Sequence, residues 1–137
     1  MKVVINNCFG GFGLSHEGVM DYARRKGITL WPEEGRFGLV TYWKVPPEER
    51  PEPQDDFYKW PIEKCKASNK AHEEAKLYDR DIPRDDPDLV ATVESLGPVA
   101  DGRCACLKVV EIPDGVDWEI EEYDGNEWVS EVHRVWS

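Results

Sequence analysis

The sequence predicts an α+β fold, in which a single small domain of residues 1–137 packs an antiparallel β-sheet against two or three helices. Three observations predict this fold. The first is that strand-like runs lie at both ends of the chain. The second is that helix-like segments with capping residues lie between them. The third is the length, because 137 residues suffice for one hydrophobic core and not for two.

The N-terminal segment predicts a strand, a glycine-rich loop and a helix in succession. A β-branched run predicts a strand over 2–7. Gly10-Gly11-Phe12-Gly13 follows as a loop. Ser15 is a suitable N-cap for a helix over 18–26, and Gly27 is a natural end for it.

The middle of the chain predicts one strand, one irregular segment and two helices. Residues 37–43 favour a strand, whereas the five prolines of 45–61 predict a loop or an extended arm. Helical spacing is present over 68–78 and over 87–96. The second of these helices has a cap in Asp86 and a proline at its first position.

The C-terminal part predicts three strands, over 104–112, 116–123 and 127–136. Asp124-Gly125 is a strong signal for a two-residue hairpin turn between the last two. The spacing of 127–136 fits a helix as well as a strand, and the hairpin favours the strand.

The charge restricts the choice of partners. The chain has 17 basic and 28 acidic residues, for a net charge of −11. This excess argues against direct nucleic-acid binding and against an anionic membrane surface. Residues 1–45 have a net charge of +2, so the remainder holds −13, and nine carboxylates with no Lys or Arg lie between Glu111 and Glu131.

The glycine loop is the first candidate site. Glycines between a strand and a helix let the backbone approach a ligand, and the N–H groups of a helix N-terminus suit a phosphate or carboxylate. The spacing is neither that of a dinucleotide fold nor that of a P-loop, and a tight structural turn is the alternative. The candidate ligand-binding residues here are Asn7, Gly10, Gly11, Gly13, Ser15 and His16.

Arginines form the second candidate site. Arg80 and Arg84 lie among aspartates ahead of the helix at 87–96. An arginine held by carboxylates presents a planar fork to an anion or a base, although surface ion pairs are the alternative. Arg134, beside His133 and Trp136, offers a guanidinium next to an aromatic face, and is included in the ligand-binding set.

The sequence contains no recognised catalytic or metal-binding motif. Cys8, Cys65, Cys104 and Cys106 lack zinc-site spacing, so free thiols, no metal and no cofactor are expected, with Cys104 and Cys106 on one face of a strand. The histidines fit no deaminase or protease pattern. A nucleophilic pair of Cys8 with His16 or with His133 stays open, and a binding protein is favoured over an enzyme.

Three segments together resemble a family of small accessory proteins of tailed phages and prophages. They are KVVINNCFGGFGLS at 2–15, DRDIPRDDPDLV at 79–90, and the stretch from IEEYDG at 120–125 to HRVW at 133–136. The resemblance implies a context and no activity, since many such accessory proteins counter host defence. It implies the cytoplasm of the host cell as the location, in agreement with the lack of a signal peptide or membrane span in the sequence.

Three functions follow as hypotheses. In the first, the protein binds and sequesters a small nucleotide-derived anion, an immune second messenger, without turnover. In the second, its acidic hairpin inhibits a host defence effector or nuclease by mimicking nucleic acid. In the third, it processes a nucleotide, with Asp81, Asp85 or His16 as acid or base. Six tryptophans and the proline-rich arm are compatible with a homo-oligomer.

Overall fold

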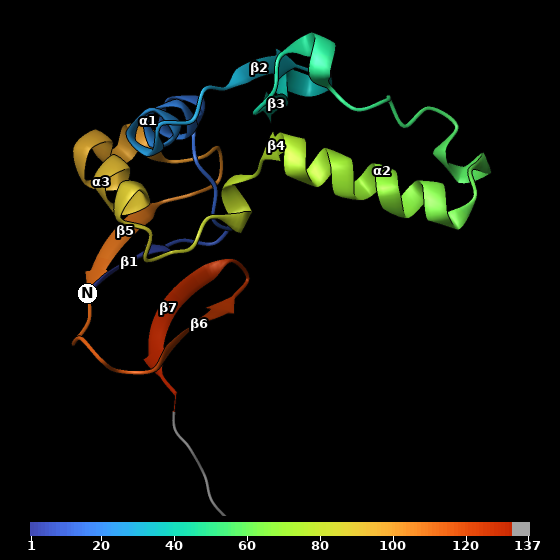
Figure 1. The fold of residues 1–137 in the computed structure, drawn as a ribbon. Helices are drawn as coiled ribbons and strands as arrows, with labels where there is room; N and C mark the ends of the chain where they lie inside the picture. Colours follow the sequence, from blue (N-terminus) through green and yellow to red (C-terminus); the bar gives the residue numbers. More distant parts are fainter. Residues whose placement is uncertain (133–137) are drawn as a thin grey trace, which may run out of the picture. The chain divides into compact units, whose positions relative to one another are not determined.

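The structure is a computed structural model that describes residues 1–132, and its fold is α+β, as predicted (Figure 1). Contacts within the chain divide it into two compact units. Unit 1 consists of Met1–Lys26 together with the chain from Asp79 onward, and unit 2 is Gly27–Tyr78. The organisation as one domain stays a prediction. No helix among the described residues is long and apolar enough to cross a membrane.

Unit 1 contains a two-stranded antiparallel sheet of β1 (Lys2–Asn6) and β5 (Leu107–Glu111). The register places Val3 opposite Val110 and Val4 opposite Val109. Val3 and Val4 are fully buried, which explains why a β-branched run forms this strand.

Two helices complete the core of unit 1. Helix α1 (His16–Lys26) begins where the Ser15 Oγ accepts a hydrogen bond from the Gly18 N–H at 3.0 Å, so Ser15 is the predicted cap. Helix α3 (Pro87–Leu96) is capped by Asp86, whose side chain accepts from the Asp88 N–H, and it ends at Gly97 with a φ of +57°. Leu89 of α3 is fully buried.

A β-hairpin forms the rest of the described part of unit 1. Strands β6 (Trp118–Tyr123) and β7 (Asn126–Glu131) are antiparallel and joined at Asp124-Gly125. Both turn residues have positive φ, of +52° and +85°, as a type I′ turn requires. The prediction of a strand after the turn is confirmed as far as Glu131, and residues 133–136 lie outside the described part.

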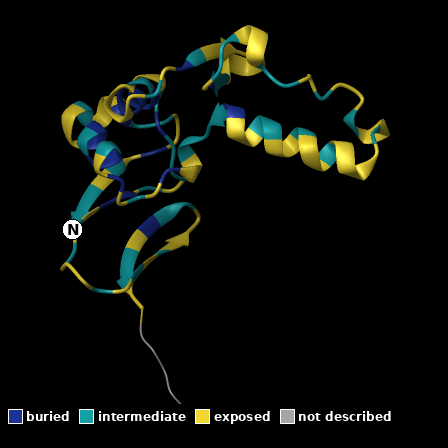
Figure 2. Ribbon diagram, viewed as in Figure 1, coloured by how far each residue is buried: buried dark blue, intermediate teal, exposed yellow. Residues whose placement is uncertain are grey.

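Unit 2 consists of a small sheet and one helix. The strands β2 (Trp31–Glu34), β3 (Val40–Trp43) and β4 (Lys76–Leu77) form an antiparallel sheet in that order. Helix α2 (Ile62–Ala75) precedes β4, and Ala75 is its one buried residue (Figure 2). Residues 45–61 hold two short 3₁₀ turns, at Pro47–Glu49 and Phe57–Lys59.

Several predicted boundaries and one predicted arrangement are wrong. The strands of residues 1–132 form three separate sheets instead of one. Helix α2 begins six residues before the predicted 68, immediately after Pro61. Strand β3 begins at Val40 because a 3₁₀ turn at Arg36–Gly38 precedes it. Cys104 and Cys106 precede β5, so they do not share a strand face.

Candidate functional site

The predicted glycine loop is packed against the turn of the hairpin. The Gly10 N–H donates to the Asp124 carbonyl oxygen at 3.2 Å. A Cβ at Gly125 would lie 2.4 Å from the Gly11 nitrogen, and a Cβ at Gly10 would lie 2.5 Å from the Cys104 carbonyl oxygen. These glycines therefore permit a close approach between backbone segments that no other residue would allow.

Hydrogen bonds also hold the C-terminal end of the glycine loop in place. The Gly13 carbonyl accepts from the Gly102 N–H at 2.8 Å, and the Leu14 N–H donates to Asp79 Oδ2 at 2.9 Å. The Ser15 hydroxyl donates to the Val99 carbonyl at 2.6 Å in addition to capping α1. The geometry of the loop is thus that of a structural turn, the alternative that the sequence left open.

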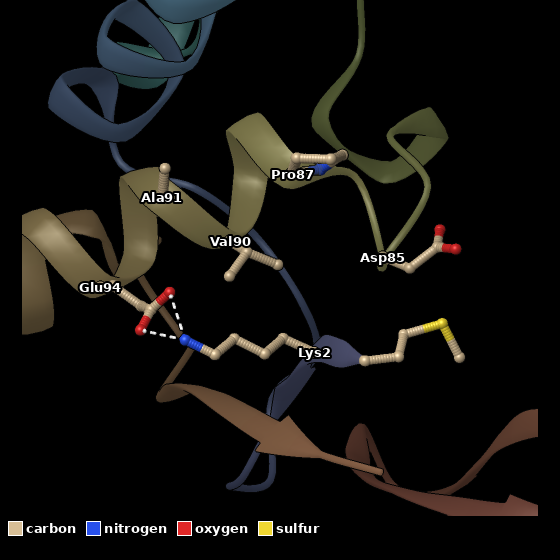
Figure 3. Close-up of a pocket in the computed structure, with 7 residues that line it drawn as sticks. Lys2, Asp85, Pro87, Val90, Ala91 and Glu94 are labelled. Carbon is tan, nitrogen blue, oxygen red and sulfur yellow. Dashed lines mark hydrogen bonds and ion pairs between the residues drawn. The ribbon is translucent and has the colours of Figure 1, made fainter. Parts of the chain in front are cut away.

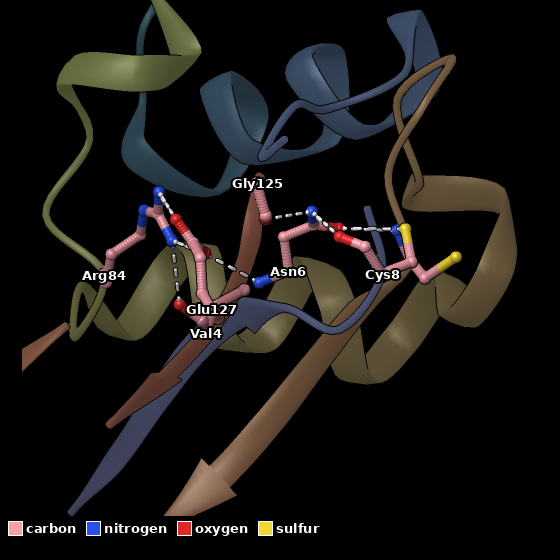
Figure 4. Close-up of polar contacts among 7 residues, drawn as sticks. Val4, Asn6, Cys8, Arg84, Gly125 and Glu127 are labelled. Carbon is pink, nitrogen blue, oxygen red and sulfur yellow. Dashed lines mark hydrogen bonds and ion pairs between the residues drawn. The ribbon is translucent and has the colours of Figure 1, made fainter. Parts of the chain in front are cut away.

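Arg84 binds within unit 1 through its whole fork (Figure 4). Its Nη1 and Nη2 donate to the two carboxylate oxygens of Glu127 at 2.6 and 2.9 Å. The Phe12 ring lies below the guanidinium, with its centroid 3.6 Å from Cζ. Both side chains of the ion pair are largely buried, at 17% and 7% exposed. Arg84 therefore ties the hairpin to the glycine loop.

Asn6 is a second tie between the same segments, and sequence reasoning did not select it (Figure 4). Its side chain is fully buried, and its Nδ2 donates to the carbonyls of Cys8 and Gly125 at 2.8 and 2.7 Å. Its Oδ1 accepts from the Cys106 N–H at 2.8 Å. The one sequence signal for this role of Asn6 is its position as a polar residue at the end of an apolar strand. Polar residues are equally common at strand ends where they hold no segments together.

The other predicted site residues lie apart from this network of buried contacts. Asn7 is exposed, and its N–H donates to the Cys106 carbonyl. His16 is the exposed first residue of α1, and Arg80 lies in a 3₁₀ turn at Asp79–Asp81. Arg134 lies outside the described residues.

Two buried carboxylates hold α1 against α3. Burial alone would raise the pKa of Asp21, but hydrogen bonds from Arg25 and Thr92 keep that pKa below its usual value. Burial acts likewise on Asp86, and its bonds with Lys26 and Tyr22 keep its pKa low. Burial and the Asp86 contact raise the pKa of Tyr22 to about 12. These groups are paired with one another within the core.

Neither the cysteine thiols nor a hollow beside α3 has the features of a catalytic or anion-binding site. A hydrogen bond with Cys106 raises the pKa of the Cys8 thiol, the opposite of what activates a nucleophile. No group of three metal-ligating side chains is found among residues 1–132. The hollow, of about 300 Å³, is lined by Met1, by apolar residues of α3, and by Lys2, Asp85 and Glu94 (Figure 3). Lys2 Nζ pairs with Glu94 Oε2 at 3.0 Å, so this cation is already neutralised.

The outer face of the hairpin remains as the candidate functional site. Glu119, Glu121 and Tyr123 alternate along β6, and the register places Trp128 of β7 opposite Glu121. The Trp128 Nε1–H donates to Glu121 Oε2 at 2.9 Å, which confirms that these two share a face. The Phe9 ring lies edge-on to Tyr123 at 6.5 Å. We call this set the hairpin face: Phe9, Glu119, Glu121, Tyr123 and Trp128.

The hairpin face is exposed and negatively charged. Phe9, Tyr123 and Trp128 are 66%, 70% and 43% exposed. Neither Glu119 nor Glu121 forms an ion pair with any residue of the described chain. The hairpin face thus combines three accessible aromatic rings with two carboxylates that form no ion pair among residues 1–132.

The chain was compared with protein-family models, with curated proteins and with solved structures, and none of the three comparisons gave a match.

Proposed function

We propose that this protein is a protein-binding module whose hairpin face docks on a basic surface of a partner protein. The observation that carries the proposal is that the hairpin face brings together exposed aromatic rings and two carboxylates that form no ion pair among residues 1–132. Aromatic residues supply most of the energy in protein interfaces, and isolated exposed ones need no explanation, whereas three together are typical of a binding surface.

The charges fit a basic partner. Carboxylates without a counter-charge raise the association rate with a positive surface, and this effect weakens as salt screens it. Arg84 and Glu127 keep the hairpin anchored, so the face is presented by a rigid element. The resemblance to phage accessory proteins suggests a host defence effector or nuclease as the partner class.

Sequestration of a nucleotide-derived anion in the glycine loop is less favoured. Such a site needs a basic group without a counter-charge, and the guanidinium of Arg84 is already paired with the carboxylate of Glu127. The glycines themselves accommodate Asp124-Gly125 and Cys104. Sequestration in the glycine loop stays a prediction that no contact among residues 1–132 supports.

The test compares charge reversals at two places. The variant Glu119→Lys/Glu121→Lys changes the hairpin face, and Glu73→Lys/Glu74→Lys makes the same change in charge on the exposed surface of α2. Immobilised wild-type protein captures partners from a host lysate, and each captured protein is purified and its Kd measured with both variants. We expect at least tenfold weaker binding for the hairpin variant alone, and a smaller salt dependence.

The variant Trp128→Ala provides a second test of partner binding in which the net charge does not change. We expect it to weaken the same partner at least tenfold, because a central aromatic residue dominates an interface. The proposal fails if partners bind both hairpin variants as tightly as wild type, or if Glu73→Lys/Glu74→Lys weakens binding equally.

A further inference from the structure

A cavity in unit 2 contains polar atoms that the fold leaves without partners. The cavity measures about 380 Å³ and lies between β2, β3, α2 and the proline-rich segment. Three residues in the described chain have a buried side-chain nitrogen or oxygen with no hydrogen-bond partner, and two of them, Arg50 and His72, line this cavity. An unpaired buried group costs free energy, so a ligand that pairs these two atoms would stabilise the folded unit.

Arg50 contributes a hydrogen-bond donor. Its Nη1 binds Glu33 Oε2 at 2.6 Å, and its Cζ lies 4.9 Å from the centroid of the Trp43 ring. The unpartnered atom is Nε. Nε belongs to a different edge of the guanidinium from Nη1, so the ion pair with Glu33 does not occupy the edge that Nε offers.

His72 contributes an acceptor. Its Nε2 lies 3.0 Å from the Glu52 carbonyl oxygen, and a carbonyl only accepts, so Nε2 carries the hydrogen. In the neutral ring the unpartnered Nδ1 then holds a lone pair. The imidazole lies 5.8 Å from the Trp43 ring, centroid to centroid, so Arg50 and His72 are both neighbours of one indole.

The charged residues that line the cavity are paired. Arg50 is paired with Glu33, and Glu52 lies 3.8 Å from Lys64. Lys76 does not line the cavity, but its Nζ lies 4.8 Å from the centroid of the Trp43 ring. The remaining lining residues are Trp43, Pro47, Pro51 and Pro53, which are apolar. An anion would find the guanidinium that lines the cavity already paired with Glu33, whereas a neutral molecule with both a donor and an acceptor would satisfy both orphan atoms.

We propose that this cavity binds a small neutral molecule carrying a carbonyl acceptor next to an N–H donor, the group shared by lactams, amides and nucleobase edges. The carbonyl accepts from Arg50 Nε, and the N–H donates to His72 Nδ1. The prolines and Trp43 cover the apolar part of the molecule. This site is independent of the hairpin face.

The test follows the two orphan atoms directly by NMR, with 2-pyrrolidone as the probe. We expect saturable shifts of the Arg50 Nε–H and of the His72 ring nitrogens. N-methyl-2-pyrrolidone has the carbonyl and lacks the donor, so it should bind about fivefold more weakly. Acetate and inorganic phosphate should produce no shift at the same concentration.

Variants separate binding from folding. Arg50→Lys keeps the charge opposite Glu33 and removes Nε–H, and we expect it to weaken 2-pyrrolidone about fivefold or more. Arg36→Lys, on an exposed turn of the same unit, is the matched control and should bind as wild type does. Circular dichroism and backbone amide spectra show whether each variant is folded, and His72→Gln provides a second route if Arg50→Lys is not.

Three results would overturn the proposal. One is the lack of any shift with 2-pyrrolidone, which would mean that water alone occupies the cavity. Another is equal binding of 2-pyrrolidone and its N-methyl analogue, which would leave His72 without a role. The third is a response to acetate or phosphate alone, which would make the cavity an anion site.

Discussion

The two units differ in how much they bury. Of the hydrophobic residues that are buried in the described chain, thirteen belong to unit 1 and three to unit 2, namely Leu30, Trp43 and Ala75. Unit 1 also buries carboxylates that have partners, among them Asp21 and Glu127. Among residues 1–132, unit 2 has two unpaired buried polar atoms, in Arg50 and His72, and unit 1 has one, Asn126 Oδ1. Helix α2 of unit 2 is mainly exposed.

The difference in burial predicts that unit 1 is the more rigid of the two units. A unit with a packed core and satisfied polar groups resists local opening, whereas one with few buried contacts opens at low cost in free energy. Unit 1 can therefore hold the hairpin face rigidly. Unit 2 has unsatisfied groups that a ligand would stabilise, because any molecule that binds the folded state alone adds to its stability.

The largest expected effect comes from making a cavity in the core of unit 1. Leu89 is fully buried in α3, and we expect Leu89→Ala to lower the free energy of unfolding by about 2–5 kcal/mol. Ile62 in α2 is 67% exposed, so Ile62→Ala should cost less than about 0.5 kcal/mol. Urea denaturation measures both, and equal costs would contradict the contrast between the units.

The next effect concerns the ion pair between Arg84 and Glu127. Glu127→Gln leaves a largely buried guanidinium without its counter-charge, and we expect a loss of about 2–3 kcal/mol. Glu121→Gln changes an exposed carboxylate of the same hairpin and should stay within about 0.5 kcal/mol of wild type. If both variants unfold at the wild-type urea concentration, the hairpin is not anchored by this pair.

The pH dependence of stability reports on the buried groups of unit 1. The pKa values of Asp21 and Asp86 are lowered in the fold, so their contribution is present above their ordinary value of 3.8 and is lost as the pH falls through the lowered values. The pKa of Tyr22 is raised to about 12, so its contribution is complete below pH 10 and is lost as the pH rises toward 12.

Thermal unfolding between pH 2 and pH 12 checks both limbs. We expect Tyr22→Phe to make the alkaline fall in Tm shallower. The acid limb should become slightly shallower too, because Asp86 loses the hydrogen bond from Tyr22 that helps to lower its pKa. An alkaline fall of the same steepness in wild type and Tyr22→Phe would show that Tyr22 does not cause it.

Local signals made unit 1 predictable from its sequence. Three of these signals act between residues that are neighbours in the sequence, so each could be predicted without knowledge of the fold. They are the cap at Ser15, the cap and proline at Asp86-Pro87, and the turn at Asp124-Gly125. The partner of Arg84 was not readable in this way, because Glu127 lies 43 residues away in the chain. The loop glycines were selected because glycine lets the backbone approach a ligand. Their close approach to Gly125 depends on a contact between distant parts of the chain and could not be predicted.

Unit 2 was less predictable because its local signals conflict with its structure. Strand β2 contains Pro32, a residue that is typical of edge strands and breaks the usual pattern. Helix α2 buries one residue, so it has almost no apolar stripe from which its start could be predicted. The cavity between Arg50 and His72 joins residues of a loop and a helix whose contact no sequence pattern predicts.

The smallest effect tests a strained turn in unit 2. Phe37 has a φ of +60° and is 91% exposed, whereas the corresponding non-glycine position in the hairpin of unit 1 is Asp124, a residue type that tolerates this conformation. We expect Phe37→Asn to stabilise the protein by about 0.5 kcal/mol, because asparagine adopts positive φ at lower cost and almost no buried surface is lost. Tyr58→Asn is the control, since Tyr58 is 81% exposed and has no positive φ, and it should give no gain. A loss of stability in Phe37→Asn alone would mean that the exposed ring packs on something, and the contrast between the two turns would then be wrong.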